Sequence, residues 1–187
     1  VLITSTVPTA NNSTATLQIE GITDETGVAQ LKVLDIPTYA QAYKLSIIPP
    51  PGSKAAAQFA KPYSVSPEDV RQLGTRVAIR GVVYDKNNEP VKDVSVTAQP
   101  SVRFLWSLEA APQAFLGSIP PSTTVTPDTG EFAVFVDSSF DNISGATPTT
   151  IWGHYDLVFE PTVKSKRPSW IQSDIELPRD AETDVVT

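Results

Sequence analysis

One histidine, His154, is the residue of this sequence best suited to act as a general base near neutral pH. The chain has no cysteine, which excludes disulfides, thiolate zinc sites and cysteine nucleophiles, and a single histidine cannot supply a His-Glu-x-x-His zinc site. Neither a nucleophilic serine motif nor an orienting carboxylate accompanies His154. We therefore interpret His154 as a structural residue at a strand edge, and we predict no catalytic residue, no metal ligand and no cofactor.

Carboxylates offer two further kinds of chemistry. The segment VDSSFDNIS carries Asp137, Asp141 and Asn142, whose oxygens suit calcium, but it lacks the alternation and the glycine of an EF-hand loop, so we favour a solvated loop. A glycosidase-type carboxylate pair needs only a separation in space, so such an enzyme stays open as an alternative without named residues. A Lys–Asn isopeptide crosslink is excluded, because Arg76 and Arg80 are the only cations of the strand that would carry the lysine.

The charge balance argues against two classes of partner. Lys and Arg number 14 against 21 Asp and Glu, and the resulting net charge of -7 repels phosphate backbones and anionic lipid headgroups. No apolar run approaches the roughly 20 residues that span a bilayer, and no signal peptide is recognisable. We expect no nucleic-acid partner and no membrane insertion. The chain starts at Val1 and contains no methionine, which we interpret as a fragment or a processed product.

An insertion at residues 101–122 carries more apolar area than a solvated loop normally does. Its run Phe-Leu-Trp would, in a strand, direct apolar groups to both faces. Two interpretations stay open: the aromatic residues bind a polysaccharide or a protein partner, or they cover the sandwich or join its units, which we favour. The candidate ligand or partner face comprises Phe104, Trp106, Phe115, Trp152 and Trp170.

Alternating hydropathy predicts the strands that position these residues. The sequence of residues 76–100 is RVAIRGVVYDKNNEPVKDVSVTAQP, which predicts two half-buried strands and a tight turn at Asn87 and Asn88. Residues 124–136 flank Pro-Asp-Thr-Gly and predict a strand, a sharp turn and a strand. Two more strands are predicted at HYDLVFEP and SWIQSDIELP. About six or seven strands in about 100 residues is the density of a β-sandwich.

The first part of the chain repeats this plan in the same order. VLITST resembles VSVTAQ, TDETGVAQLKV resembles TPDTGEFAVFV, and AYKLSIIPP resembles HYDLVFEP. No counterpart of the opening strand RVAIRGVVYD precedes them. We predict residues 1–66 as a partial β-sandwich repeat without its opening strand, 67–75 as a short helical linker, 76–178 as a complete β-sandwich and 179–187 as an acidic tail that frays or leads toward a further module.

The string IRGVVYDKNNEPVKDVSVTA, followed by TVTPDTGEFAVFV and YDLVFEP, resembles the carboxypeptidase regulatory-like domain family. Two residues depart from the family pattern: Asn88 replaces a turn glycine, and His154 stands where a glycine before tyrosine is common. The residues that fit the pattern are Gly81, Val83, Asp85, Pro90, Val91, Val94, Val96, Asp128, Gly130, Phe132, Tyr155 and Leu157.

This resemblance implies an all-β chain of two tandem Ig-like or transthyretin-like β-sandwich domains. It carries no peptidase activity, because the zinc ligands of a carboxypeptidase catalytic domain are absent. Family members are typically tandem accessory modules of secreted or envelope proteins, including bacterial lipoproteins, which implies an extracellular or cell-envelope location. We expect a non-catalytic structural or adhesive module, a spacer or protein-interaction domain. The alternative is a carbohydrate-binding module that uses exposed aromatics of residues 101–122.

Overall fold

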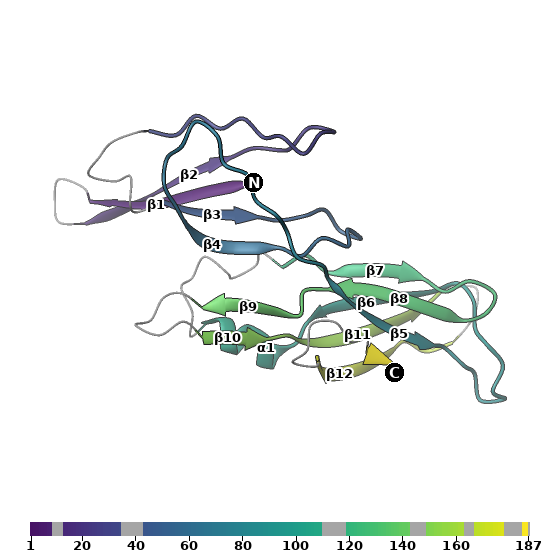
Figure 1. Ribbon diagram of the computed structural model, residues 1–187. Helices are drawn as coiled ribbons and strands as arrows, with labels where there is room; N and C mark the ends of the chain where they lie inside the picture. The colour runs from purple at the N-terminus through teal and green to yellow at the C-terminus, as the bar shows by residue number, and fades with distance from the viewer. Residues whose placement is uncertain are drawn as a thin grey trace. The chain divides into compact units, whose positions relative to one another are not determined.

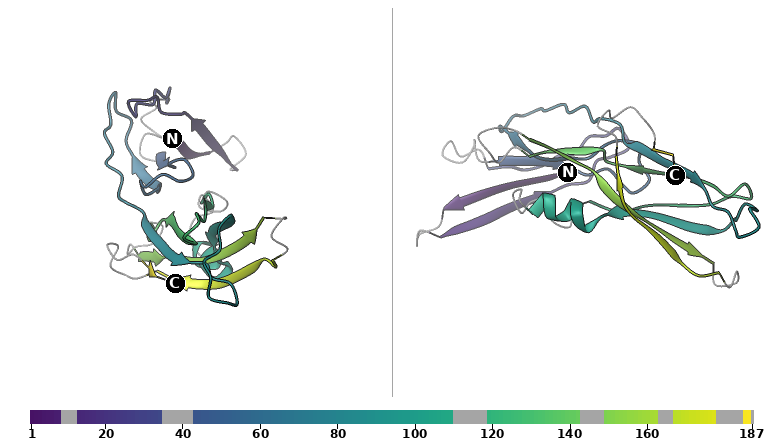
Figure 2. Two further views of the ribbon diagram at one scale, coloured as in Figure 1. Left: turned by 90° about the vertical axis from the view of Figure 1, so that its right-hand side faces the viewer. Right: turned by 90° about the horizontal axis from the view of Figure 1, so that it is seen from below.

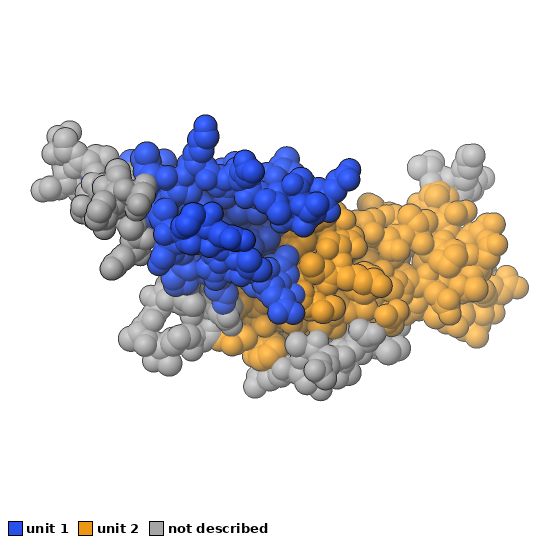
Figure 3. Space-filling model, turned by 45° about the horizontal axis from the view of Figure 1, so that its top comes forward, with its two compact units in different colours: residues 1–48, 57–73 blue, residues 49–56, 74–187 orange. Residues whose placement is uncertain are grey.

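Strands account for almost all of the regular secondary structure (Figure 1), and the one helix of the described residues, α1 (Val102–Glu109), is seen from two further sides in Figure 2. The computed structural model describes residues 1–8, 13–34, 43–109, 119–142, 149–162, 167–177 and 185–186. Contacts divide the chain into two compact units, residues 1–48 with 57–73 and residues 49–56 with 74–187 (Figure 3). No helix in the described ranges has the length and apolar character to cross a membrane. The predicted all-β fold class is confirmed.

The first unit is built on one four-stranded antiparallel sheet in the order β2-β1-β3-β4. Its strands are β1 (Leu2–Pro8), β2 (Thr14–Glu20), β3 (Tyr43–Ile47) and β4 (Gln58–Tyr63). Apolar residues at alternating positions direct one set of side chains to a common face. That face forms the core of the unit, with Ile3, Tyr43, Leu45 and Tyr63 buried.

The second unit is a β-sandwich of two sheets, β12-β11-β6-β7 and β13-β5-β8, with a separate ladder of β9 and β10. All of its strand pairs are antiparallel except β13 with β5. The strands are β5 (Val77–Val82), β6 (Val94–Pro100), β7 (Ser122–Val125), β8 (Glu131–Val136), β9 (Ser139–Asn142), β10 (Thr149–Trp152), β11 (His154–Pro161), β12 (Trp170–Glu176) and β13 (Val185–Val186).

Side chains that alternate along the strands fill the space between the two sheets. β6 buries Val94, Val96 and Ala98 and leaves the residues between them partly exposed. Phe132 of β8 meets Phe159 of β11 edge to face, with 5.6 Å between the ring centroids, so side-chain packing joins the sheets. Burial of each such valine or phenylalanine stabilises the fold by about 1.5–3 kcal/mol. The alternation in the sequence therefore marks the core of the sandwich.

The segment between the units is irregular, so the predicted helical linker at residues 67–75 is wrong. Ser66 Oγ accepts the Glu68 N–H at 3.4 Å and donates to the Glu68 carbonyl at 2.7 Å, which closes a local turn. Val70, the central apolar residue of the segment, is 85% exposed. A helix of one or two turns gains too few hydrogen bonds to offset its nucleation unless packing supports it.

The boundary between the units also differs from the prediction. Residues 49–56 belong to the second unit, although they were expected in the first repeat. The Ala56 N–H donates to the Gly74 carbonyl at 2.7 Å, and the Arg76 N–H donates to the Lys54 carbonyl at 2.8 Å. These bonds attach the segment to the chain that leads into β5.

The end of the chain is paired rather than frayed where the structure describes it. Val185 and Val186 lie parallel to Ile79 and Arg80 as the short strand β13, which corrects the prediction of a fraying tail for these two residues. Valine favours extended backbone, and an edge strand such as β5 presents backbone groups that pair readily. The rest of the predicted tail lies outside the described residues.

The two Thr-Gly turns of the sequence share one backbone geometry. The Gly27 N–H donates to the Asp24 carbonyl at 3.0 Å, and the Gly130 N–H donates to the Pro127 carbonyl at 2.9 Å. Both glycines have a left-handed φ, 82° and 73°, which favours glycine. The strand predicted after the turn forms in the second unit as β8. In the first unit, residues 28–34 form no strand with other described residues, so that part of the prediction is wrong.

Alanine at Gly130 is expected to destabilise its unit more than alanine at Gly27 does. Both substitutions place a Cβ in the left-handed region, which costs about 1–2 kcal/mol. At Gly130 the Cβ would also lie 2.7 Å from the Val83 carbonyl oxygen, whereas at Gly27 it meets open space. All 3 tryptophans lie in the second unit, so Trp fluorescence in urea measures that unit, and hydrogen exchange in β1 measures the first. Equal losses would contradict this expectation.

Candidate functional site

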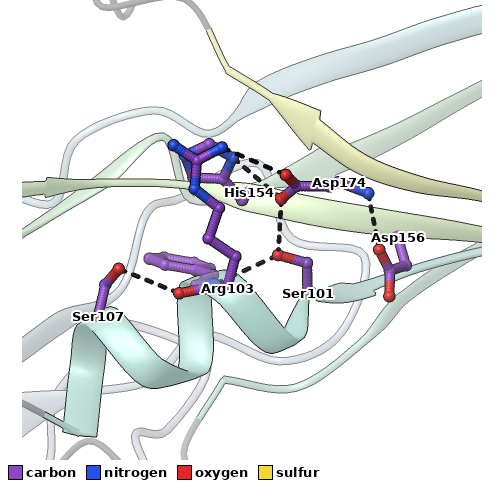
Figure 4. A network of polar contacts seen from close by, with 7 residues as sticks. Ser101, Arg103, Ser107, His154, Asp156 and Asp174 are labelled. Carbon is purple, nitrogen blue, oxygen red and sulfur yellow. Dashed lines mark hydrogen bonds and ion pairs between the residues drawn. The ribbon is translucent and has the colours of Figure 1, made fainter.

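A cluster of polar side chains surrounds the start of α1 beside β11 and β12 (Figure 4). Ser101 and Arg103 lie at the start of α1, His154 is the first residue of β11, and Asp174 belongs to β12. Serine, histidine and a carboxylate are the residue types of nucleophilic catalysis. Their geometry decides whether they can act together.

Asp174 is the centre of the cluster. Its Oδ1 accepts the Ser101 hydroxyl at 3.2 Å, and its Oδ2 lies 3.3 Å from Nη1 of Arg103. The backbone N–H of Asp174 donates to Oδ1 of Asp156 at 2.8 Å, and the φ of Asp174 is 57°. Desolvation raises the pKa of Asp174, but hydrogen bonds from Arg103 and Ser101, together with nearby His154, outweigh it and hold that pKa below its ordinary value. Asp174 is therefore a carboxylate that ties α1 to β12.

Ser101 is the N-cap of α1. Its Oγ accepts the Phe104 N–H at 3.2 Å, and its carbonyl accepts the Leu105 N–H at 3.0 Å, which satisfies two of the first donors of the helix. The residue is 2% exposed, and its hydroxyl proton is directed to Asp174. Because the hydroxyl is buried and occupied by the cap, a substrate cannot reach it as a nucleophile.

His154 does not connect the serine to the carboxylate. Its Nδ1 lies 3.2 Å from Oδ1 of Asp174 but is not aligned for a hydrogen bond, and the imidazole is buried. In a catalytic triad the imidazole stands between the carboxylate and the hydroxyl, whereas here Asp174 contacts both His154 and Ser101. The cluster therefore stabilises the start of α1 and does not activate a nucleophile. Sequence reasoning missed the carboxylate beside His154, because Asp174 reaches it from the neighbouring strand.

The insertion at residues 101–122 begins as a helix, so the alternation that its Phe-Leu-Trp run would have in a strand does not apply. A serine precedes Phe104, Leu105 and Leu108, which recur at helical spacing. That pattern is a helix start signal. It could have revealed both α1 and its cap from the sequence.

Asp137, the first of the calcium candidates, is buried in an ion pair. Nη2 and Nε of Arg76 lie 3.2 Å and 3.3 Å from Oδ2 of Asp137, both side chains are 3% exposed, and Nη1 of Arg76 donates to the Ser53 carbonyl at 3.2 Å. The solvated-loop interpretation is therefore wrong for Asp137, whose carboxylate faces a guanidinium. The backbone of Asp141 and Asn142 lies in β9. Across the described ranges, no group of three or more His, Cys, Asp or Glu side chains is placed to hold a metal.

Two aromatic residues of α1 point in different directions. Phe104 is 0% exposed and packs on Phe140 and Tyr155, with ring centroids 5.7 Å and 5.5 Å away. Trp106 is 67% exposed. Residues two positions apart on a helix do not share a face. Phe104 therefore belongs to the core, and Trp106 is presented to solvent.

The remaining predicted aromatics do not extend this exposed position into an aromatic platform. Trp170 is 58% exposed, and one side of its ring stacks on Phe159 with 4.9 Å between centroids. Trp152 is half-buried, and Phe115 lies outside the described residues. The structure thus separates the predicted face into a core residue, a half-buried residue and two exposed tryptophans.

Comparison with known proteins assigns neither a family nor a function to the chain. No protein-family model, no curated protein and no solved structure matches the chain. The function is therefore argued from what the described residues bring together: a helix cap, a buried ion pair and an exposed tryptophan.

Proposed function

We propose that the chain is a non-catalytic structural module of a secreted or cell-envelope protein, which serves as a spacer or protein-interaction domain. The observation that carries the proposal is that the polar side chains that the structure brings together, around Asp174 and around Asp137, make structural contacts within the second unit. Asp174 ties α1 to β12, and Asp137 neutralises Arg76. The Asp137 carboxylate is 3% exposed and faces a guanidinium, and the Ser101 hydroxyl is buried as a helix cap, so neither group is accessible to a substrate.

Two further observations support this role. Residues 76–177 resemble carboxypeptidase regulatory-like domains, whose members are typically accessory modules of secreted or envelope proteins, and this supports the extracytoplasmic location. The second unit is also a sandwich, whose two sheets bury apolar side chains between them. A close-packed interior is hard to compress, which suits a spacer.

A carbohydrate-binding module is the second candidate, and the exposure of Trp106 favours it. An indole that is 67% exposed on a short helix offers a flat apolar surface, against which a sugar ring can stack. The burial of Phe104 removes the neighbour that would have widened this platform. The spacer proposal therefore stands first.

Affinity electrophoresis in gels that contain soluble β-glucan or xylan separates the two candidates. A spacer is expected to migrate at the same rate with and without polysaccharide, because one indole buries too little area for measurable binding. Val102→Ala is the matched control for Trp106→Ala, since Val102 lies on the same helix and is 57% exposed. If polysaccharide slows the migration of the unmodified chain and of Val102→Ala but not of Trp106→Ala, the spacer proposal is replaced by carbohydrate binding.

A further inference from the structure

β2 lies at one edge of the sheet of the first unit (Figure 1). In the order β2-β1-β3-β4 it pairs with β1 alone among the described residues, and its seven residues pair with those of β1 one for one without a register shift. A long and regular edge strand presents a row of backbone donors and acceptors that another strand can use. β2 is therefore a candidate for pairing with a further strand.

The other edge strands of the two four-stranded sheets carry features that discourage such pairing. β4 contains Lys61 and Pro62 and has a register shift against β3. β12 has a register shift against β11 and a left-handed Asp174, and β7 is four residues long. Lysine, proline, bulges and short length all protect an edge strand from pairing with another chain. β2, with the sequence TATLQIE, has none of these features.

A strand that completed the first unit would not cover this edge. The orders β2-β1-β3-β4 and β7-β6-β11-β12 correspond, so β7 has the place of β2 in the second unit, and it is an edge strand too. β5, the strand without a counterpart among the described residues of the first unit, pairs with β8 in the other sheet. A strand that completed the first unit as β5 completes the second would therefore leave β2 open.

The direction of the backbone groups of β2 follows from the pair of Val1 and Gly21. The Gly21 N–H donates to the Val1 carbonyl at 2.9 Å, and the Val1 amino group donates to the Gly21 carbonyl at 2.8 Å. In an antiparallel pair every second residue repeats this exchange, so the odd-numbered residues of β2 bond to β1. The even-numbered residues direct their N–H and C=O groups out of the sheet edge. They are Thr14, Thr16, Gln18 and Glu20.

A second copy of β2 is complementary to this edge. Two copies that run antiparallel about a two-fold axis at Leu17 place Thr16 opposite Gln18 and Thr14 opposite Glu20. All the outward residues then pair, whereas a shift of one copy by two residues in either direction leaves one of them in each copy without a partner on β2. The same register places Leu17 opposite Leu17, so the side chains that pack on the core of one copy meet those of the other.

The distribution of charge permits two copies to approach along this edge. β1 carries no charged residue and β2 carries only Glu20, although 19% of the whole chain is charged. In the antiparallel register the two Glu20 side chains lie at opposite ends of the strand pair, whereas a parallel pair in register would place them side by side. The edge that is free to pair is thus a nearly uncharged part of an acidic chain.

We propose that β2 is a self-association edge, at which two copies of the chain pair antiparallel about a two-fold axis at Leu17. The two sheets join into one sheet with four strands from each copy, held by the main-chain hydrogen bonds of the outward residues. Contact between single strands buries little area, so the dimer is weak and forms at high concentration. The proposal uses only the strand geometry of the first unit, so it fails or holds independently of the spacer role.

Disulfide trapping tests the register, because the chain has no cysteine of its own. The probes are the 187-residue chains Thr16→Cys and Gln18→Cys, both changed at exposed positions, in a glutathione buffer with about 0.15 M salt, which screens the repulsion between acidic copies. A mixture of the two chains is expected to give at least tenfold more covalent dimer than either chain alone. Residues that are directly opposite lie within the reach of a disulfide, whereas two copies of the same position would be diagonal neighbours at about 7–8 Å.

Thr16→Pro tests the edge without cysteines. The Thr16 N–H points away from β1, so proline preserves the pairing with β1 and removes a donor that the dimer needs. In sedimentation equilibrium, the mass of the unmodified chain is expected to rise with concentration toward twice that of the monomer, and Thr16→Pro is expected to associate at least tenfold more weakly. Thr16→Val keeps the N–H and is the matched control, expected to associate as the unmodified chain does. Unchanged hydrogen exchange in β3 would show that the proline variant is folded.

Hydrogen exchange at single residues shows where the copies meet. As the concentration rises, the amides of Thr16 and Gln18 are expected to exchange more slowly, whereas the amide of Leu17, which bonds to β1, is not expected to change. A chain that stays monomeric, or a mixture that crosslinks no better than the single variants, would overturn the proposal. So would a dimer that Thr16→Pro leaves intact. Slow exchange of Thr16 in the dilute monomer would also overturn it, because another part of the same chain would then cover β2.

Discussion

Asp137→Ala is expected to lower the free energy of unfolding of the second unit by about 3–5 kcal/mol. Asp137 and Arg76 are each 3% exposed, and their closest charged atoms are 3.2 Å apart. Removal of the carboxylate leaves a guanidinium without its counter-charge in a site that water does not reach, and such a charge is strongly destabilising. Urea unfolding followed by Trp fluorescence measures the loss, because the tryptophans report on this unit.

Two further variants show whether the loss of stability comes from the unpaired buried charge of Arg76 or only from the lost attraction between the two side chains. The double variant Arg76→Met with Asp137→Leu is expected to recover most of the stability, since it removes both charges and keeps apolar volume. Asp128→Ala breaks the ion pair with Lys92, in which the Lys92 side chain is 62% exposed and the Asp128 side chain is 84% exposed. This variant is expected to change the free energy of unfolding by less than about 0.5 kcal/mol. A loss at Asp137 no larger than the loss at Asp128 would refute the argument.

Phe104→Ala is expected to cost about 3–5 kcal/mol in the same measurement. The ring is 0% exposed and lies between Phe140 and Tyr155, so truncation leaves a cavity that the two neighbouring rings cannot fill without moving. α1 would also lose its buried contact with the sandwich. A faster exchange of the α1 amides in the variant would show that the helix depends on this residue.

Trp106→Ala is the matched control for Phe104→Ala, because it removes a larger aromatic side chain from the same helix. Trp106 is 67% exposed, so its removal is expected to change the free energy of unfolding by less than about 0.5 kcal/mol. A comparable loss in the two variants would mean that Trp106 packs in solution. That result would also remove the observation that favours carbohydrate binding.

The parts of the fold that follow from local chemistry could be predicted from the sequence. Alternation at β6 and β8 marked the strands and their inward faces. The asparagine turn also follows from the sequence: Asn88 has a φ of 64°, and Oδ1 of Asp85 accepts the N–H groups of Asn87 and Glu89 at 2.9 Å and 3.1 Å. Each of these features depends on residues that are near one another along the chain.

The parts that depend on distant residues could not be predicted in the same way. The solvated loop assigned to Asp137 became a buried carboxylate because Arg76 reaches it across the unit, and no pattern near Asp137 indicates that partner. The helix predicted at residues 67–75 does not form for a different reason: Val70 is 85% exposed, so burial of its side chain does not stabilise a helix there. Ser101 had a readable cap signal, but its second partner, Asp174, lies on β12. The environment of a side chain that contacts residues distant in the sequence therefore cannot be predicted from the local sequence pattern.

The pairing of β13 with β5 has a consequence for the order in which the protein is made. Val185 pairs with Ile79, so a ribosome must add about a hundred residues after β5 before that edge is covered. At about 5–20 residues per second, the edge is uncovered for about 5–20 seconds in every newly made chain. Arg80 is exposed on β5, and Gly81 follows it. A charge and a weak strand former at this point slow the pairing of one nascent chain with another until the last strand arrives.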